Sequence, residues 1–154
     1  MKKAIKKKIS GWFLLLLIGG FLLFFLYNAW VHSINHPPKA KTAVTKDSYG
    51  NMIKYISIEM MSCSIGETTS MGGNLTCHGR TADSVIAAAV IAKDDVMNAY
   101  ETDKQAVTSG GTNTSDSDVG YIRLSVSGEN IIIKTCHTKP CTTMNQSSKT
   151  IAFQ

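Results

Sequence analysis

The longest uncharged apolar run of the chain lies near its N-terminus, between Trp12 and Val31. It follows a leader, residues 1–11, that carries five lysines. The run has about the 20 residues that an α-helix needs to cross the hydrocarbon of a bilayer. A helix also satisfies its own backbone hydrogen bonds, which lipid cannot do. The sequence therefore predicts a single transmembrane helix over 12–31.

The flanks of this run predict its orientation. Lysines crowd the leader, and no further basic residue occurs before Lys39. Because basic flanks stay in the cytoplasm, we expect the N-terminus inside and the rest of the chain outside. Aromatic residues at both ends of the run are typical of membrane interfaces. The residues in these roles are Lys2, Lys3, Lys6, Lys7 and Lys8 for topology, and Trp12, Tyr27 and Trp30 as interfacial anchors.

Two alternatives to a retained anchor stay open. The triplet Val31-His32-Ser33 is an acceptable cleavage site, which would make the run a signal peptide. A basic leader that ends in Gly11 and continues directly into an apolar helix also resembles the leader of type IV prepilins. That resemblance implies removal of residues 1–11 and a helix that continues into the exported domain. The chain departs from the family at two places. Leu16 stands where prepilins carry a glutamate as the fifth mature residue, and Pro37-Pro38 is expected to end the helix.

Charge and cysteine content limit what the exported part can be. The leader holds five of the 16 basic residues, which leaves 11 basic against 11 acidic residues elsewhere. The basic balance therefore belongs to the topology signal and does not indicate nucleic-acid binding. All four cysteines lie in the exported part, and an even number there predicts two disulfides. Of three pairings we favour Cys63–Cys77 and Cys136–Cys141, because each pair lies at the end of a strand-like run.

The exported part divides into a linker, 32–51, and one domain, 52–154. Two prolines and the turn-forming residues 48–51 predict the linker. Alternating apolar residues predict a strand over 52–62, and a short strand over 75–77 would return beside it. Apolar residues at steps of three and four predict a helix over 81–104, capped by Thr81. Residues 137–148 form a loop in this scheme, and 150–153 a last strand.

The strongest local pattern is a β-hairpin over 121–136 with a two-residue turn at Gly128-Glu129. Pairing Val126 with Ile131 and Leu124 with Ile133 gives one apolar face. A slip of one residue would turn that face to water, so burial fixes the register. The order of elements predicts an α+β domain with an antiparallel sheet and one main helix.

The exported part contains a set of soft metal ligands, namely Cys77, His78, Cys136, His137 and Cys141. Thiolates and imidazoles suit zinc or copper. The chain has no C-x-x-C spacing, however, and an oxidising compartment favours disulfides. We therefore predict no metal site and no cofactor.

Two aspartates, Asp116 and Asp118, are spaced as in a calcium-binding loop. Ser127 occupies the twelfth position, where such a loop carries a glutamate. We therefore expect a solvated, glycine-rich loop over 105–118.

The chain carries no G-x-S-x-G and no glycine-rich phosphate loop. We therefore predict a non-enzymatic inner-membrane protein with a periplasmic domain. Its expected role is that of an adaptor or structural subunit of an envelope complex, such as a secretion, conjugation or pilus apparatus. The expected partners are the membrane and other envelope proteins, with oligomerisation left open. The alternatives are a type IV pilin-like subunit processed after Gly11, and a metal- or redox-active envelope enzyme that uses the Cys/His set.

Overall fold

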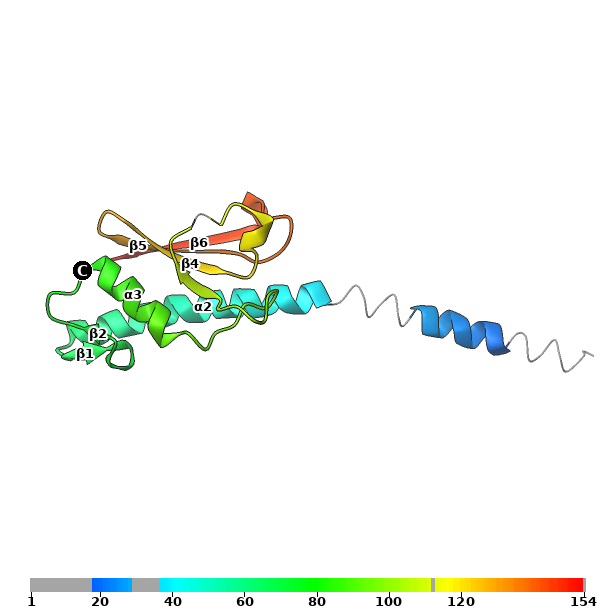
Figure 1. Ribbon diagram of the computed structural model, residues 1–154, viewed down its shortest axis with the longest axis horizontal. Coiled ribbons are helices and arrows are strands. Elements are labelled where there is room, and N and C mark those ends of the chain that lie inside the picture. Colours follow the sequence, from blue (N-terminus) through cyan, green and yellow to red (C-terminus); the bar gives the residue numbers. More distant parts are fainter. Residues whose placement is uncertain (1–17, 29–36, 112, 154) are drawn as a thin grey trace, which may run out of the picture. The chain divides into compact units, whose positions relative to one another are not determined.

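The computed structural model describes residues 18–28, 37–111 and 113–153 (Figure 1). The chain divides into two compact units, Met1–Pro37 and Pro38–Gln154. In the first unit, residues 18–28 are helical, and Tyr27 is exposed. None of the helices within the described ranges is both long and apolar enough to cross a membrane. The predicted segment 12–31 extends beyond 18–28 at both ends, and Trp12, Trp30 and the leader lysines lie outside the described residues.

Helix α2, Pro37–Ser64, is 28 residues long. It occupies the residues for which a linker over 32–51 and a strand over 52–62 were predicted, so the strand and the part of the linker from Pro37 onward were wrong. Proline is favourable in the first turn of a helix, because the first N–H groups have no intrahelical acceptor and the ring fixes φ near the helical value. Pro37 and Pro38 therefore begin a helix here, where we expected them to end one.

The strand prediction failed because α2 carries apolar side chains on both of its faces. Met52, Ile56 and Met60 recur at steps of four and are buried against the domain. Ile58 and Met61 point the other way and are 64% and 65% exposed. Together the two sets imitate the alternation of a half-buried strand.

The main sheet has the order β3-β4-β5-β6. Its strands are β3 (Val107–Ser109), β4 (Ile122–Ser127), β5 (Asn130–Cys136) and β6 (Gln146–Ala152). The β4–β5 hairpin has the predicted register, with Val126 opposite Ile131 and Leu124 opposite Ile133. Strand β6 is antiparallel to β5 and begins earlier than the predicted strand 150–153, whereas β3 is parallel to β4.

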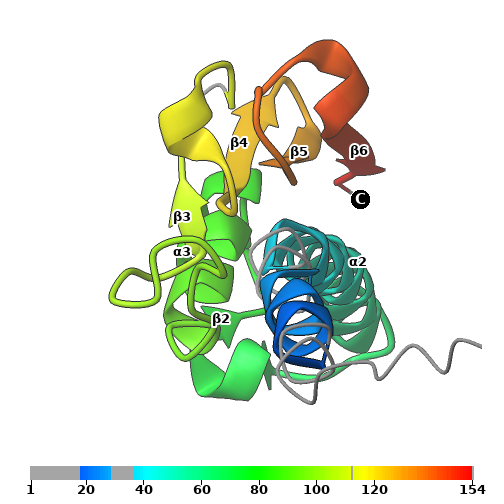
Figure 2. The same ribbon diagram turned by 90° about the vertical axis from the view of Figure 1, so that its right-hand side faces the viewer.

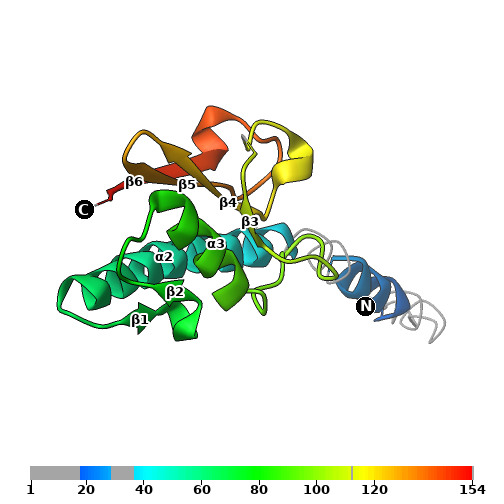
Figure 3. The ribbon, with the colours of Figure 1, turned by 60° about the vertical axis from the view of Figure 1, so that its left-hand side comes forward.

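Helix α3, Ala82–Ala92, begins as predicted, with Thr81 and Ser84 in a capping box. It ends well before residue 104, because the chain turns after Ala92 and residues 96–106 fold back on themselves, with Asn98 N donating to Lys104 O. Helices α2 and α3 lie on one face of the main sheet (Figures 2 and 3). The core between them is filled by side chains from both helices and from β4 and β5.

The remaining elements are short. Strands β1 (Thr69–Ser70) and β2 (Leu75–Thr76) form a small antiparallel sheet, so β2 returns beside β1 and not beside residues 52–62. Single 3₁₀ turns occur at Met71–Gly73, Asp116–Asp118 and Thr143–Asn145. Disulfides join Cys63 at the end of α2 to Cys77, and Cys136 at the end of β5 to Cys141, which is the pairing that we favoured. The second unit is thus α+β with antiparallel pairing and two disulfides.

Candidate functional site

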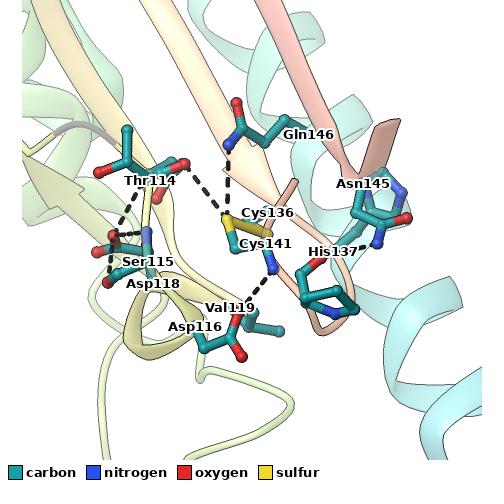
Figure 4. Close-up of a disulfide and its surroundings, with 12 residues drawn as sticks. Thr114, Ser115, Asp116, Asp118, Val119, Cys136, His137, Cys141, Asn145 and Gln146 are labelled. Carbon is teal, nitrogen blue, oxygen red and sulfur yellow. Dashed lines mark hydrogen bonds between the residues drawn. A yellow bond between two sulfur atoms is a disulfide. The ribbon is translucent and has the colours of Figure 1, made fainter. Parts of the chain in front are cut away.

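A network of polar contacts lies where two loops meet beyond the end of the main sheet (Figure 4). We call it the disulfide site and define it as residues 113–118 together with residues 136–141. Asp116 Oδ1 accepts a hydrogen bond of 2.7 Å from the backbone N–H of Cys141. Cys141 Sγ lies 3.3 Å from the carbonyl oxygen of Asn113. The Cys136–Cys141 disulfide therefore holds both loops in one arrangement.

A second carboxylate, Asp118, orders the first loop from within. It accepts hydrogen bonds from the backbone N–H groups of Thr114 and Ser115, both 3.1 Å long. It also forms an ion pair with Arg123 at a distance of 2.9 Å. Burial acts to raise the pKa of the Asp118 carboxyl, but the hydrogen bonds from Ser115 and Arg123 outweigh it and hold that pKa below its ordinary value. Both aspartates of the suspected calcium loop are thus engaged with protein groups.

Behind the site, Asn98 joins the turn after α3 to the start of β4. Its side chain is fully buried, and Nδ2 donates to Val119 O at 3.2 Å. Oδ1 accepts from the backbone N–H groups of Tyr100 at 2.8 Å and Glu101 at 3.3 Å. Gly120 packs directly on this amide with φ +88°. The amide therefore fixes where β4 starts, and with it the position of the loop 113–118.

Tyr100 connects the site to α2. Its hydroxyl donates to the carbonyl oxygen of His137 at 2.9 Å and lies 3.1 Å from Thr42 Oγ1 on α2. His137 is buried, and its Nδ1 has no hydrogen-bond partner among the residues that the structure describes. Burial, followed by the charge of Lys46 on α2, lowers the pKa of the His137 imidazole. The buried imidazole of His137 is therefore part of the contact between α2 and the disulfide site.

This histidine makes stability depend on pH. An unfolded histidine titrates near 6.5, whereas the native pKa of His137 is lower. Below about pH 6.5 the unfolded chain takes up a proton that the native chain does not, so native stability falls as the pH is lowered through that value. We expect His137→Gln to flatten the fall in melting temperature between pH 7.5 and 5. Equal slopes for wild type and His137→Gln would refute the assignment.

The two disulfides should contribute unequally to stability. The bridges span 14 and 5 residues. Loop-closure entropy gives about 3 kcal/mol for the longer bridge and about 2 kcal/mol for the shorter one. Replacing each pair by serines and measuring unfolding in denaturant checks this order. Loss of the Cys136–Cys141 pair should also expose the loop 113–118 to proteolysis, whereas loss of Cys63–Cys77 should leave it protected.

A hollow of about 380 Å³ borders the site and has a charged rim. Its lining is Tyr100, Glu101, Asp116, Ser117, Val119 and Lys139. Glu101 in this rim is already paired, with Lys104 Nζ at 2.7 Å and the Tyr121 hydroxyl at 2.9 Å. The hollow is thus a concave surface with charged side chains at its rim, which is suited to contact with another molecule.

The structure does not bring together the five Cys and His residues that were considered as soft metal ligands. Cys77 packs in the main core, whereas Cys136 and Cys141 belong to a separate small cluster. His78 is exposed, and His137 is buried behind the second disulfide. Across the described ranges, no three His, Cys, Asp or Glu side chains are arranged to hold a metal ion.

The residues that shape the site most strongly, Asn98, Tyr100 and Gly120, were not singled out from the sequence. Asn98 lies 21 residues from the carbonyl that it binds, inside a stretch predicted as helix. Only Gly120, directly before the first hairpin strand, gave a local turn signal. Comparison with protein-family models, with curated proteins and with solved structures gave no match. The proposed function therefore rests on the sequence and the geometry of this chain.

Proposed function

We propose that this chain is a pilin-like structural subunit of an envelope assembly, inserted in the membrane through residues 12–31. The observation that carries the proposal is α2, which begins at Pro37, soon after the apolar segment, and continues to Ser64 as the central helix of the domain. The prepilin resemblance implies a helix of this kind. Pro37 and Pro38 stand in the first turn of α2 and do not interrupt it.

The cysteine pairing supports an exported domain. Each bridge starts from the end of an element, Cys63 in the last turn of α2 and Cys136 at the end of β5, and no free cysteine occurs in the described chain. Disulfides of this kind form and persist in the periplasm and outside the cell. A cytoplasmic N-terminus agrees with the lysine-rich leader, and a domain beyond the membrane agrees with the two disulfides.

The disulfide site supports a role in contacts between proteins. Its thiols are oxidised, and Asp116 and Asp118 are held by hydrogen bonds within the protein. Rigid loops on a compact scaffold are typical of interaction surfaces. A subunit that is held in place by its anchor and displays such a surface suits assembly, and we assign it no catalytic step.

A second candidate is a bitopic adaptor that keeps its leader. It is favoured by Leu16, which stands where the prepilin pattern has a glutamate. The adaptor and the pilin-like subunit share topology and fold. They differ in the fate of residues 1–11.

Intact mass distinguishes the two. We expect the full chain, produced in a bacterium that has a prepilin peptidase and purified from its membranes, to start at Trp12. The variant Gly11→Leu should retain the leader, because a bulky side chain replaces the small residue before the scissile bond. The matched variant Gly19→Leu, within the segment, should be processed normally. A wild-type mass that includes residues 1–11 would select the adaptor, and a chain that starts after Ser33 would contradict both candidates.

A further inference from the structure

Strand β6 lies at an open edge of the main sheet. The sheet order places β5 on one side of it, and no strand of the described chain pairs with its other side (Figure 2). The strand is seven residues long and contains no proline, and its three central residues, Ser148, Lys149 and Thr150, are all exposed. Such an edge is a template for the backbone of another chain.

The hydrogen bond at the end of β6 shows which of its backbone groups point away from the sheet. The N–H of Phe153 donates to the carbonyl oxygen of Glu129 at 2.9 Å. In an antiparallel pair, residues that bond to the neighbouring strand alternate with residues that do not. Counting back from Phe153 in the β5–β6 register, Ser148 and Thr150 are residues of the second kind. Their N–H and C=O groups therefore face outward, and among the described residues they have no hydrogen-bond partner.

A hollow of about 350 Å³ lies between the end of this edge and α2. Ile151 lines it from the strand, and Met61, which is 65% exposed, lines it from the helix. Ile151 is paired with the buried Ile131, so both side chains lie on the face of the sheet that the helices cover. An apolar side chain on the same face of an added strand would fill this hollow and cover Met61.

The charge at the centre of the edge selects the partner. Lys149 lies two residues before Ile151 and therefore on the same face. It is exposed and forms no ion pair within the described chain. A lysine on an edge strand opposes pairing with an apolar strand, and two copies of β6 paired about Lys149 would bring two ammonium groups together. A carboxylate on the added strand removes that cost, so the edge favours a segment with acidic and apolar side chains on one face.

From these observations we infer that the edge of β6 binds an extended, acidic segment of another protein, which adds to the main sheet as an antiparallel strand. The segment carries an apolar residue opposite Ile151 and, two residues later, a carboxylate opposite Lys149. Both positions form non-hydrogen-bonded pairs, in which side chains lie closest together. Backbone hydrogen bonds to Ser148 and Thr150 supply affinity, and the two side-chain contacts supply specificity.

The inference goes beyond the proposed function and does not depend on it. All of the residues that carry it belong to the second unit, Pro38–Gln154. The fate of residues 1–11 therefore has no bearing on whether this edge accepts a strand.

A heptapeptide with blocked ends and the sequence TITETVT has the required pattern and serves as the probe. With the full chain in detergent micelles, we expect millimolar peptide to slow amide hydrogen exchange at Ser148 and Thr150. The peptide TITKTVT, in which lysine replaces the glutamate, should bind about tenfold more weakly. Lys149→Glu should reverse this preference. The matched variant Lys39→Glu, which makes the same charge change at an exposed position in the first turn of α2, should keep it.

A proline in the edge strand tests the backbone contact separately. Because the N–H of Thr150 points outward, Thr150→Pro removes no hydrogen bond of the sheet, and edge strands tolerate proline. We expect this variant to keep a melting temperature close to that of the wild type and to lose peptide binding. Thr150→Ala, which retains the N–H, should bind as the wild type does.

Three results would overturn the inference: no protection of Ser148 and Thr150 by TITETVT, undiminished binding to Thr150→Pro, or an unchanged peptide preference in Lys149→Glu. None of them alters the intact mass of the chain. Failure of the strand addition therefore leaves the proposed function standing, and a chain that keeps its leader leaves the strand addition standing.

Discussion

Gly120→Ala should unfold a large part of the population under conditions in which the wild type is stable. Gly120 has φ +88°, and a Cβ there would lie 2.8 Å from Asn98 Cγ and 3.0 Å from Tyr100 Cδ2, with Asn98 Oδ1 closer still. The left-handed backbone costs about 1–2 kcal/mol for alanine. Displacing the Asn98 amide leaves the part-buried backbone N–H groups of Tyr100 and Glu101 unpaired, at about 1–3 kcal/mol each. We expect a total loss of about 4 kcal/mol, measured by denaturant unfolding.

Gly128→Ala is the matched control. Gly128 also has a positive φ, +60°, but nothing lies within 4 Å of a Cβ placed on it. Only the backbone term of about 1 kcal/mol applies. Equal losses for the two variants would show that the contact between Gly120 and Asn98 does not hold the start of β4.

Ile56→Ala should have the second large effect. Ile56, in the C-terminal half of α2, is fully buried, and deleting such a side chain typically costs about 2–5 kcal/mol. Ile58→Ala, two residues on, should change the free energy of unfolding by less than about 0.5 kcal/mol in the monomer. A strand over 52–62 would put both side chains on the same face and predict equal losses. The ratio of the two losses thus tests whether this segment is helical.

Local patterns in the sequence predicted the hairpin and the start of α3. A two-residue turn between alternating runs fixes register through neighbours only a few residues apart, and the Thr81–Ser84 capping box lies within one turn. Helix α2 was missed for a physical reason. Its apolar residues serve two faces, one buried in the domain and one exposed, so helical periodicity is obscured.

The site was less accessible from sequence, because its contacts join distant segments. Tyr100 meets the carbonyl of His137 across 37 residues, and Asp116 meets Cys141 across 25. No local propensity encodes such contacts. The disulfide pairing was the exception, because the two cysteines of each bridge are close in the sequence, 14 and 5 residues apart.

The most direct test of the central claim, that a membrane-inserted N-terminal segment delivers this α+β domain outside the cytoplasm, is a compartment-specific reporter fused after residue 154. Bacterial alkaline phosphatase needs disulfides that form only after export, so the fusion should be active in intact cells. The matched fusion to a chain that lacks residues 12–31 should be inactive. An inactive full-length fusion, together with activity of a cytoplasmic reporter at the same position, would contradict the account.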